Sequence, residues 1–196
     1  VADSFVRHSH VPVLLLHPSG SSAAPQPIAP HPLRKICITL DGSPLAEQIL
    51  TPALALGAGN AAEYTLLHVV DALVLVSTSF TPDLLQHQAK IIAGLQQEAQ
   101  QYLETLAGPL RAEGHHITTR VLVDPEPAQA ILRAARDDGS DIIALATHGR
   151  GGVQRLLVGS VADKVLRSAD RPVLVYRPQV APQPEVEAKI AHDVGV

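Results

Sequence analysis

The sequence predicts an α/β protein built on a doubly wound, five-stranded parallel sheet with helices on both faces. Two observations support this fold class. From Lys35 onward, short apolar runs alternate with stretches of helical spacing, which is the pattern of repeated strand–helix units. Hydrophobic residues also make up 46% of the 196-residue chain while aromatic residues make up only 3%, so the core must be aliphatic, as is typical of buried parallel sheets.

Charge and cysteine content narrow the function classes. The formal net charge is -4 and the chain has no basic run, so nucleic acid is not an expected partner. Cys37 is the single cysteine, which excludes an internal disulfide and a multi-cysteine metal site. No apolar run approaches the roughly 20 residues that span a bilayer, and no signal peptide is visible. We therefore expect no membrane contact and a cytoplasmic location.

Five strands are expected, because five runs have the length and the apolar character of buried strands. In the run DIIALA every residue after Asp141 is apolar, as in a central strand covered on both faces. The predicted strands, in chain order, are residues 35–40, 63–70, 117–123, 141–146 and 172–176.

Helices are expected between these strands. The first follows Asp41-Gly42-Ser43 and opens with Pro44, so that Ser43 or Asp41 is positioned to cap it. The second carries apolar residues every three or four positions and ends at Gly114. The predicted helices are residues 44–58, 82–113, 126–137 and one that ends near Ala169, and residues 71–81 are read as an apolar loop.

Two predicted strand ends carry the candidate ligand-binding residues. Ligands of doubly wound folds lie beyond the carboxyl ends of the strands, at a topological switch point. The first strand delivers Asp41, whose carboxylate can accept hydrogen bonds from ribose hydroxyls. The fourth predicted strand, a neighbour of the first, is followed by THGRGG. Nine residues then separate Gly149 from Gly159-Ser160. Glycine backbone, the Ser160 hydroxyl and the start of the next helix suit a di- or triphosphate, and an ordinary flexible turn is the alternative for the glycine-rich stretch.

With this glycine motif and its flanking segments, the sequence resembles the universal stress protein family. Nucleotide-binding members carry Gly-x2-Gly-x9-Gly-Ser/Thr after the fourth strand, and here Gly149-x9-Gly159-Ser160 is intact. The stretches LDGS, LATHGRGG and LLVGSVADKVLRSADRPVLV are also similar to this family, and the likeness covers Lys35 to about Pro178. The resemblance implies an adenine nucleotide α-hydrolase-like fold that binds ATP, together with Mg²⁺ or Mn²⁺ held largely by phosphate oxygens rather than by protein ligands.

The resemblance also implies roles for single residues. Thr39, Leu40 and Asp41 would line the adenosine pocket, with Asp41 on the ribose, and the backbone of Val69 would meet the adenine. The phosphates would be held by Gly149, Gly159, Ser160 and Val161. Ala146 stands where the motif has its first glycine, and its methyl group lies near the expected ribose position.

A repeat indicates how the chain is organised. Residues 1–18 match residues 161–178 at eight positions without gaps. The matched segment follows Gly159-Ser160, so we expect residues 1–18 to be the last helix and strand of a preceding universal stress domain. Residues 19–34 would be a linker, 35–178 the domain itself and 179–196 a flexible tail. Because family members pair through their fifth strands, residues 11–16 (VPVLLL) are expected to pair with residues 172–176, as another universal stress domain would in a homodimer or a tandem pair.

The predicted function is that of a nucleotide-dependent stress-response regulator. No arrangement of side chains indicates a catalytic site, and no metal-ligating residue is predicted. Two alternatives stay open: an interaction module of the same fold that has lost its nucleotide, which Ala146 favours, and a slow ATP hydrolase.

Overall fold

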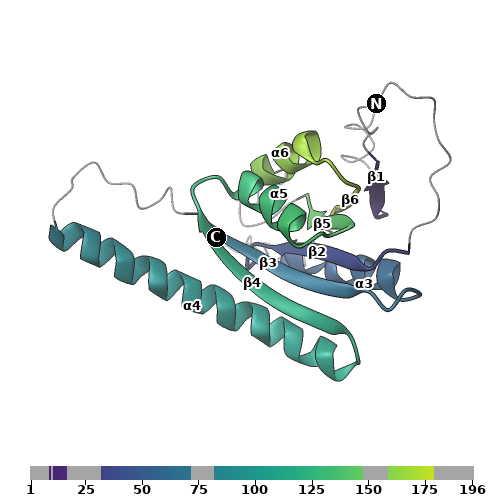
Figure 1. The fold of residues 1–196 in the computed structure, drawn as a ribbon, viewed down its shortest axis with the longest axis horizontal. Coiled ribbons are helices and arrows are strands. Elements are labelled where there is room, and N and C mark those ends of the chain that lie inside the picture. Colours follow the sequence, from purple (N-terminus) through teal and green to yellow (C-terminus); the bar gives the residue numbers. More distant parts are fainter. Residues whose placement is uncertain (1–8, 10, 17–31, 72–81, 148–158, 179–196) are drawn as a thin grey trace, which may run out of the picture.

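The computed structural model confirms the predicted α/β fold (Figure 1). It describes residues 9, 11–16, 32–71, 82–147 and 159–178. The described elements are β1 (Val13–Leu15), β2 (Lys35–Leu40), α2 (Pro44–Glu47), α3 (Leu50–Gly57), β3 (Glu63–Asp71), α4 (Pro82–Ala112), β4 (His116–Asp124), α5 (Pro127–Asp137), β5 (Ile142–Ala146), α6 (Ser160–Ser168) and β6 (Val173–Tyr176).

Within the described part of the chain, six strands form one sheet in the order β1-β6-β5-β2-β3-β4. The five predicted strands are β2 to β6; they run parallel to one another, and each agrees with its predicted range to within one residue at either end. The chain proceeds outward from β2 to β3 and β4, and then returns to β5 on the other side of β2. The strand order therefore reverses between β2 and β5, which makes this pair the switch point.

The sixth strand, β1, is antiparallel to β6 at the edge of the sheet. Its three residues lie opposite β6 in the register Val13↔Val175, Leu14↔Leu174 and Leu15↔Val173. This confirms the predicted pairing of residues 11–16 with residues 172–176. The origin of β1 in a preceding domain stays a prediction. The described residues do not include residues 1–8 and 10, most of the expected linker or the expected tail from residue 179.

Helices cover both faces of the sheet, as a doubly wound fold requires. On one face α2, α3 and α4 pack over a core that includes Ile38, Leu66 and Leu103. On the other face α5 and α6 pack over a second core that includes Ile143 and Val165. Both cores are aliphatic because the strands between them are buried from both sides. None of the described helices combines the length and apolar character needed to cross a membrane.

The helix predicted at residues 44–58 is corrected to two helices. It begins as expected at Pro44, but α2 ends at Glu47 and α3 starts at Leu50. Between them the amides of Gln48 and Ile49 donate to carbonyl oxygens three residues back, at 3.3 and 3.2 Å, which is a tighter turn than an α-helix. Pro52 has no N–H to donate to the Gln48 carbonyl, so the α-helical ladder is interrupted there.

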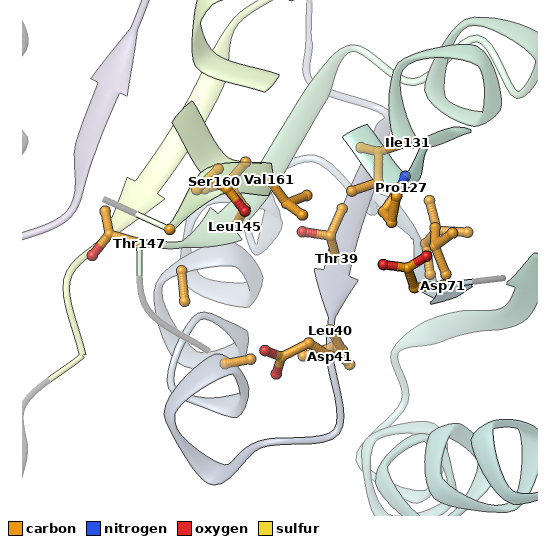
Figure 2. A pocket seen from close by; sticks show the side chains of 16 residues that line it. Thr39, Leu40, Asp41, Asp71, Pro127, Ile131, Leu145, Thr147, Ser160 and Val161 are labelled. Carbon is orange, nitrogen blue, oxygen red and sulfur yellow. The ribbon is translucent and has the colours of Figure 1, made fainter. Parts of the chain in front are cut away.

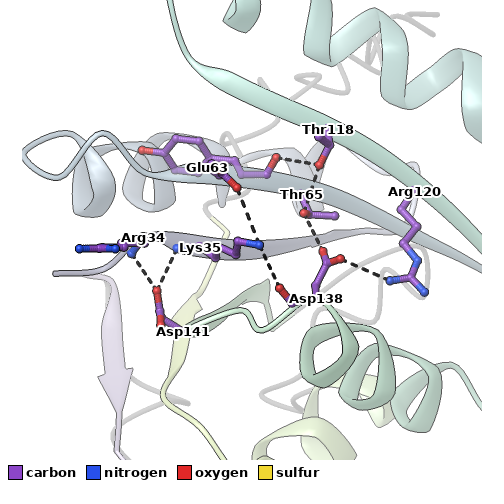
Figure 3. A network of polar contacts seen from close by, with 9 residues as sticks. Arg34, Lys35, Glu63, Thr65, Thr118, Arg120, Asp138 and Asp141 are labelled. Carbon is purple, nitrogen blue, oxygen red and sulfur yellow. Dashed lines mark hydrogen bonds and ion pairs between the residues drawn. The ribbon is translucent and has the colours of Figure 1, made fainter. Parts of the chain in front are cut away.

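The amino ends of the strands are joined by polar side chains (Figure 3). A single carboxylate oxygen of Asp141, just before β5, accepts from the amides of Arg34 and Lys35 at 2.7 and 2.9 Å. Next to it, Thr65 in β3 donates its hydroxyl hydrogen to Asp138 at 3.0 Å. These contacts fix the starts of β2, β3 and β5 relative to one another, at the end of the sheet opposite the switch-point edge.

Candidate functional site

A pocket opens at the carboxyl ends of the strands, where the switch point places it. It has a volume of about 420 Å³, within the range of small-molecule sites. Residues from β2, β3, β5, α5 and the start of α6 surround it (Figure 2). Its lining comprises Thr39, Leu40, Asp41, Ala46, Leu67, Val69, Asp71, Pro127, Ile131, Leu145, Ala146, Thr147, Gly159, Ser160, Val161 and Ala162.

The structure brings eight of the nine predicted site residues into this one pocket. They come from four segments far apart in the sequence: Thr39, Leu40, Asp41, Val69, Ala146, Gly159, Ser160 and Val161. The ninth, Gly149, lies outside the described residues. The lining establishes that these residues are neighbours, and their roles toward a nucleotide stay a prediction.

Asp41 is oriented by the turn that follows it. One of its carboxylate oxygens accepts from the amide of Ser43 at 3.0 Å and from the Ser43 hydroxyl at 2.6 Å. The Ser43 oxygen in turn accepts from the amide of Ala46 at 3.1 Å, so Ser43 is the N-cap of α2. Gly42 has a φ of 82°, which glycine adopts without strain. Of the two predicted caps, Ser43 caps the helix directly and Asp41 holds Ser43 in place.

The start of α6 supplies backbone donors on the opposite side of the pocket. Gly159 is the N-cap, and no side chain caps this end of α6 among the described residues. The Gly159 amide donates to the carbonyl oxygen of Thr147 at 2.7 Å, so it is already engaged within the chain. The amides of Ser160 and Val161 come next, in the first turn, where a helix offers no acceptor of its own. A phosphate at this end would therefore be held by Ser160 and Val161 rather than by the Gly159 amide.

Ala146, which replaces the motif's first glycine, is the last residue of β5 and is partly buried. It lies beside Tyr176 of β6 in the sheet register and contributes to the pocket lining. The volume of about 420 Å³ is that of the pocket with this methyl group in its wall.

Several lining residues were not anticipated from the sequence. Leu67 and Asp71 lie on β3 two residues before and after Val69, so the period of two along a strand places all three on one face. That alternation was a usable signal. Pro127 and Ile131 lie one turn apart on α5 and cover the pocket from above the sheet. Their contribution depends on how α5 crosses the sheet, which local sequence does not specify.

No group of three or more His, Cys, Asp or Glu side chains is arranged to hold a metal ion within the described ranges. Among the described residues that line the pocket, the ionisable side chains are Asp41 and Asp71. The pocket thus combines apolar walls, two carboxylates and a helix N-terminus.

These features define an open, doubly wound α/β protein with a ligand-sized pocket at its switch point. The model of the universal stress protein family matches residues 32–177, which is most of the chain. The chain therefore belongs to the universal stress protein family. This confirms the resemblance drawn from the glycine motif and its flanking segments.

Individual relatives agree with this assignment. Universal stress protein MJ0577 of Methanocaldococcus jannaschii is 28% identical over 154 residues, covering 74% of this chain and 94% of the relative. Universal stress protein Rv2623 of Mycobacterium tuberculosis is 30% identical over 179 residues, covering 90% of this chain but only 54% of the relative. The chain thus spans about half the length of that relative.

Solved structures show the same fold. The structure of MJ0577 superposes with a TM-score of 0.69 at 27% identity, covering 77% of this chain and 100% of that one. The universal stress protein UspA from Lactobacillus plantarum superposes with a TM-score of 0.65 at 22% identity, covering 75% of this chain and 99% of that one. The second likeness concerns the fold alone.

Proposed function

We propose that this protein binds ATP in the switch-point pocket and acts as a nucleotide-dependent stress-response regulator. The observation that carries the proposal is the convergence of eight predicted site residues on one pocket of about 420 Å³. These residues supply the three kinds of surface that a nucleotide needs: an apolar slot, a carboxylate for the sugar and backbone donors for the phosphates.

Each part of the nucleotide has a counterpart in the lining. Leu67, Val69 and Ile131 offer apolar walls for a flat base. Asp41 lies at the end of β2, near the start of α2, and would accept hydrogen bonds from the ribose hydroxyls (Figure 2). The amides of Ser160 and Val161, with the positive end of the α6 dipole, would bind the phosphates.

A divalent cation, Mg²⁺ or Mn²⁺, would accompany the phosphates. Because these hard cations are commonly bound through substrate phosphates and water, the lack of a carboxylate cluster among the described residues is compatible with such binding. The cation would neutralise phosphate charge, and the described residues would contribute the orientation of base, sugar and phosphate.

Hydrolysis of the nucleotide is not part of the proposal. Within the described lining, no Lys, Arg or His side chain is present to stabilise charge that develops on a transferred phosphoryl group. Asp41, a carboxylate that lines the pocket, already accepts two hydrogen bonds from Ser43. The geometry therefore favours binding over hydrolysis. We propose that the nucleotide-bound state regulates cytoplasmic protein partners.

The test is titration calorimetry of the full chain with MgATP. We expect saturable binding with one ATP per chain, and a loss of at least about tenfold in affinity for Asp41→Ala, which removes a charge-assisted hydrogen bond to the ribose. Asp141→Ala is unsuitable as a control because it breaks the strand anchor, so Asp137→Ala at the exposed end of α5 serves instead.

An interaction module without nucleotide is the second candidate, and Ala146 is the observation that favours it. Ala146→Gly restores the family motif and removes one methyl group from the lining. If the unmodified chain shows no ATP affinity and Ala146→Gly gains it, the second candidate is correct. If neither binds ATP, nucleotide binding by this pocket is wrong.

A further inference from the structure

Asp71 is a pocket carboxylate that the proposed function leaves without a role. It is the last residue of β3 and lines the pocket at the end away from Ser160 and Val161 (Figure 2). Asp41 occupies a third position, near the start of α2. The two carboxylates therefore serve different parts of any ligand that spans the pocket.

The neighbours of Asp71 identify which part of a ligand it meets. Leu67 and Val69 precede it on the same face of β3, and Pro127 and Ile131 of α5 lie across the pocket from that face. A strand rises about 3.3 Å per residue, so the Asp71 side chain begins roughly 6.6 Å beyond that of Val69. The phosphate end of a nucleotide would lie at the start of α6 on the other side, so an apolar slot bounded by Asp71 suits the edge of a flat, nitrogen-containing ring.

We propose that Asp71 is a specificity-determining residue, and that its carboxylate accepts a hydrogen bond from the exocyclic amino group of adenine. This rests on the proposed function, since it presumes that a purine nucleotide occupies the pocket. The residue would select 6-aminopurine nucleotides over 6-oxopurine nucleotides, which are otherwise of nearly the same size and carry the same phosphates.

The selection follows from donor and acceptor chemistry. A carboxylate accepts hydrogen bonds and cannot donate them. The 6-amino group of adenine donates, whereas the 6-oxo group of hypoxanthine accepts and would place two acceptors face to face. Asp71 is exposed at the rim of the pocket, and a base of the opposite polarity seated against it would bring two acceptors together with no hydrogen bond between them.

The experiment compares ATP with ITP, whose base differs from adenine at the 6-position and at the protonation of N1. Dissociation constants of both nucleotides, with Mg²⁺, are measured on the full chain by calorimetry for the unmodified protein and for Asp71→Asn. Asparagine keeps the size of the side chain and adds an amide group that can donate to a 6-oxo oxygen. We expect a preference for ATP of about tenfold in the unmodified protein, falling to less than about threefold in Asp71→Asn.

Asp124→Asn is the matched control. Asp124 lies directly beside Asp71 in the sheet register but does not belong to the described pocket lining. Its side chain accepts from the amide of Glu126 at 2.8 Å and pairs with Arg133, and asparagine can still accept from the amide. This variant should therefore keep the full preference for ATP.

The possible outcomes separate the two proposals. If ATP binds but the unmodified protein does not distinguish ATP from ITP, or if Asp71→Asn keeps the preference, the role of Asp71 is wrong and the proposed function stands. If Asp124→Asn loses the preference for ATP as fully as Asp71→Asn does, the preference comes from the negative charge of this region and not from a hydrogen bond to Asp71, and the proposed role of Asp71 is wrong. If neither nucleotide binds, the proposed function itself fails, and the assignment of Asp71 fails with it.

Discussion

The amide nitrogen of Gly159 lies 2.7 Å from the carbonyl oxygen of Thr147 and donates a hydrogen bond to it. The amide of Thr147 donates in turn to the carbonyl oxygen of Tyr176 at 2.9 Å. The end of β5, the start of α6 and the end of β6 are therefore held together by backbone contacts. A Cβ atom at position 159 would lie 3.3 Å from the Thr147 oxygen, a closer approach than most side chains make.

The first prediction is that Gly159→Val disrupts ligand binding while the fold is kept. The added side chain would push the start of α6 and Thr147 apart, and we expect this to displace the donors of Ser160 and Val161. We expect ATP affinity to fall by at least about tenfold and the free energy of unfolding to fall by about 1–3 kcal/mol, as overpacking usually costs. Calorimetry and urea unfolding measure the two effects.

Gly94→Val on α4 is the control for this variant, because a Cβ atom at Gly94 meets nothing within 4 Å. It adds the same side chain at a glycine that does not contact Thr147. Unchanged ATP affinity in Gly159→Val would show that the close approach has no bearing on the site.

A second prediction concerns Cys37, whose side chain in β2 is 1% exposed. Burial, aided by the nearby charge of Asp138, raises the pKa of the Cys37 thiol from its ordinary value of 9.0 to about 12. The unfolded thiol ionises before the folded one does, so its contribution to stability is complete below the unfolded pKa and is lost as the pH rises toward about 12. The thiol is thus a core group and not a nucleophile, as its place in an apolar strand suggests.

Urea unfolding at about pH 8 and about pH 10 tests this assignment. The unmodified chain should lose more stability between the two values than Cys37→Ala does. Burial also raises the pKa of Tyr64, but that effect is common to both proteins and cancels in the comparison. Equal losses in the two proteins would mean that the Cys37 thiol is not shielded.

The third prediction is that β1 masks the edge of β6. Its three residues lie opposite Val173–Val175, which is the strand expected to pair with another universal stress domain. Proline lacks the N–H that a strand ladder needs, so Val13→Pro/Leu14→Pro should release β1 and expose that edge. The variant should then form dimers that increase with protein concentration, measured by light scattering after size-exclusion chromatography.

The control for this variant is Val13→Ala/Leu14→Ala, which shortens the same side chains and keeps both backbone donors. It should resemble the unmodified chain in its state of association. If the proline variant and the unmodified chain have the same state of association over this concentration range, β1 does not compete with a second domain for β6.

The architecture was predictable because its signals are local. Each parallel strand is a short apolar run, and the turns between strands carry glycine, proline or a capping residue such as Ser43. The division of the first helix into α2 and α3 was missed, although Pro52 carried the signal. A proline in the first turn of a helix is usually tolerated, and here its effect lies one turn earlier, at the Gln48 carbonyl.

The candidate site was predictable where it follows from strand ends and from the family motif. Asp41 and Ser160 were predicted from strand ends and also from the resemblance to the family, and the structure places them in the same pocket. Pro127 and Ile131 were not predictable in this way, because α5 reaches the pocket through its packing on the sheet. The hydrogen bond from the Gly159 amide to Thr147 was not predictable from the sequence either. It depends on a contact between two segments that only the folded chain brings together.

The anchoring of the strands by Asp141 and Asp138 has a practical consequence. These contacts secure the amino ends of β2, β3 and β5, while the pocket is formed at their carboxyl ends. Directed evolution of the lining, at positions such as Leu67, Val69 or Ile131, would therefore leave that anchor intact. The domain offers a scaffold in which new ligand preferences can be selected separately from the interactions that keep the sheet assembled.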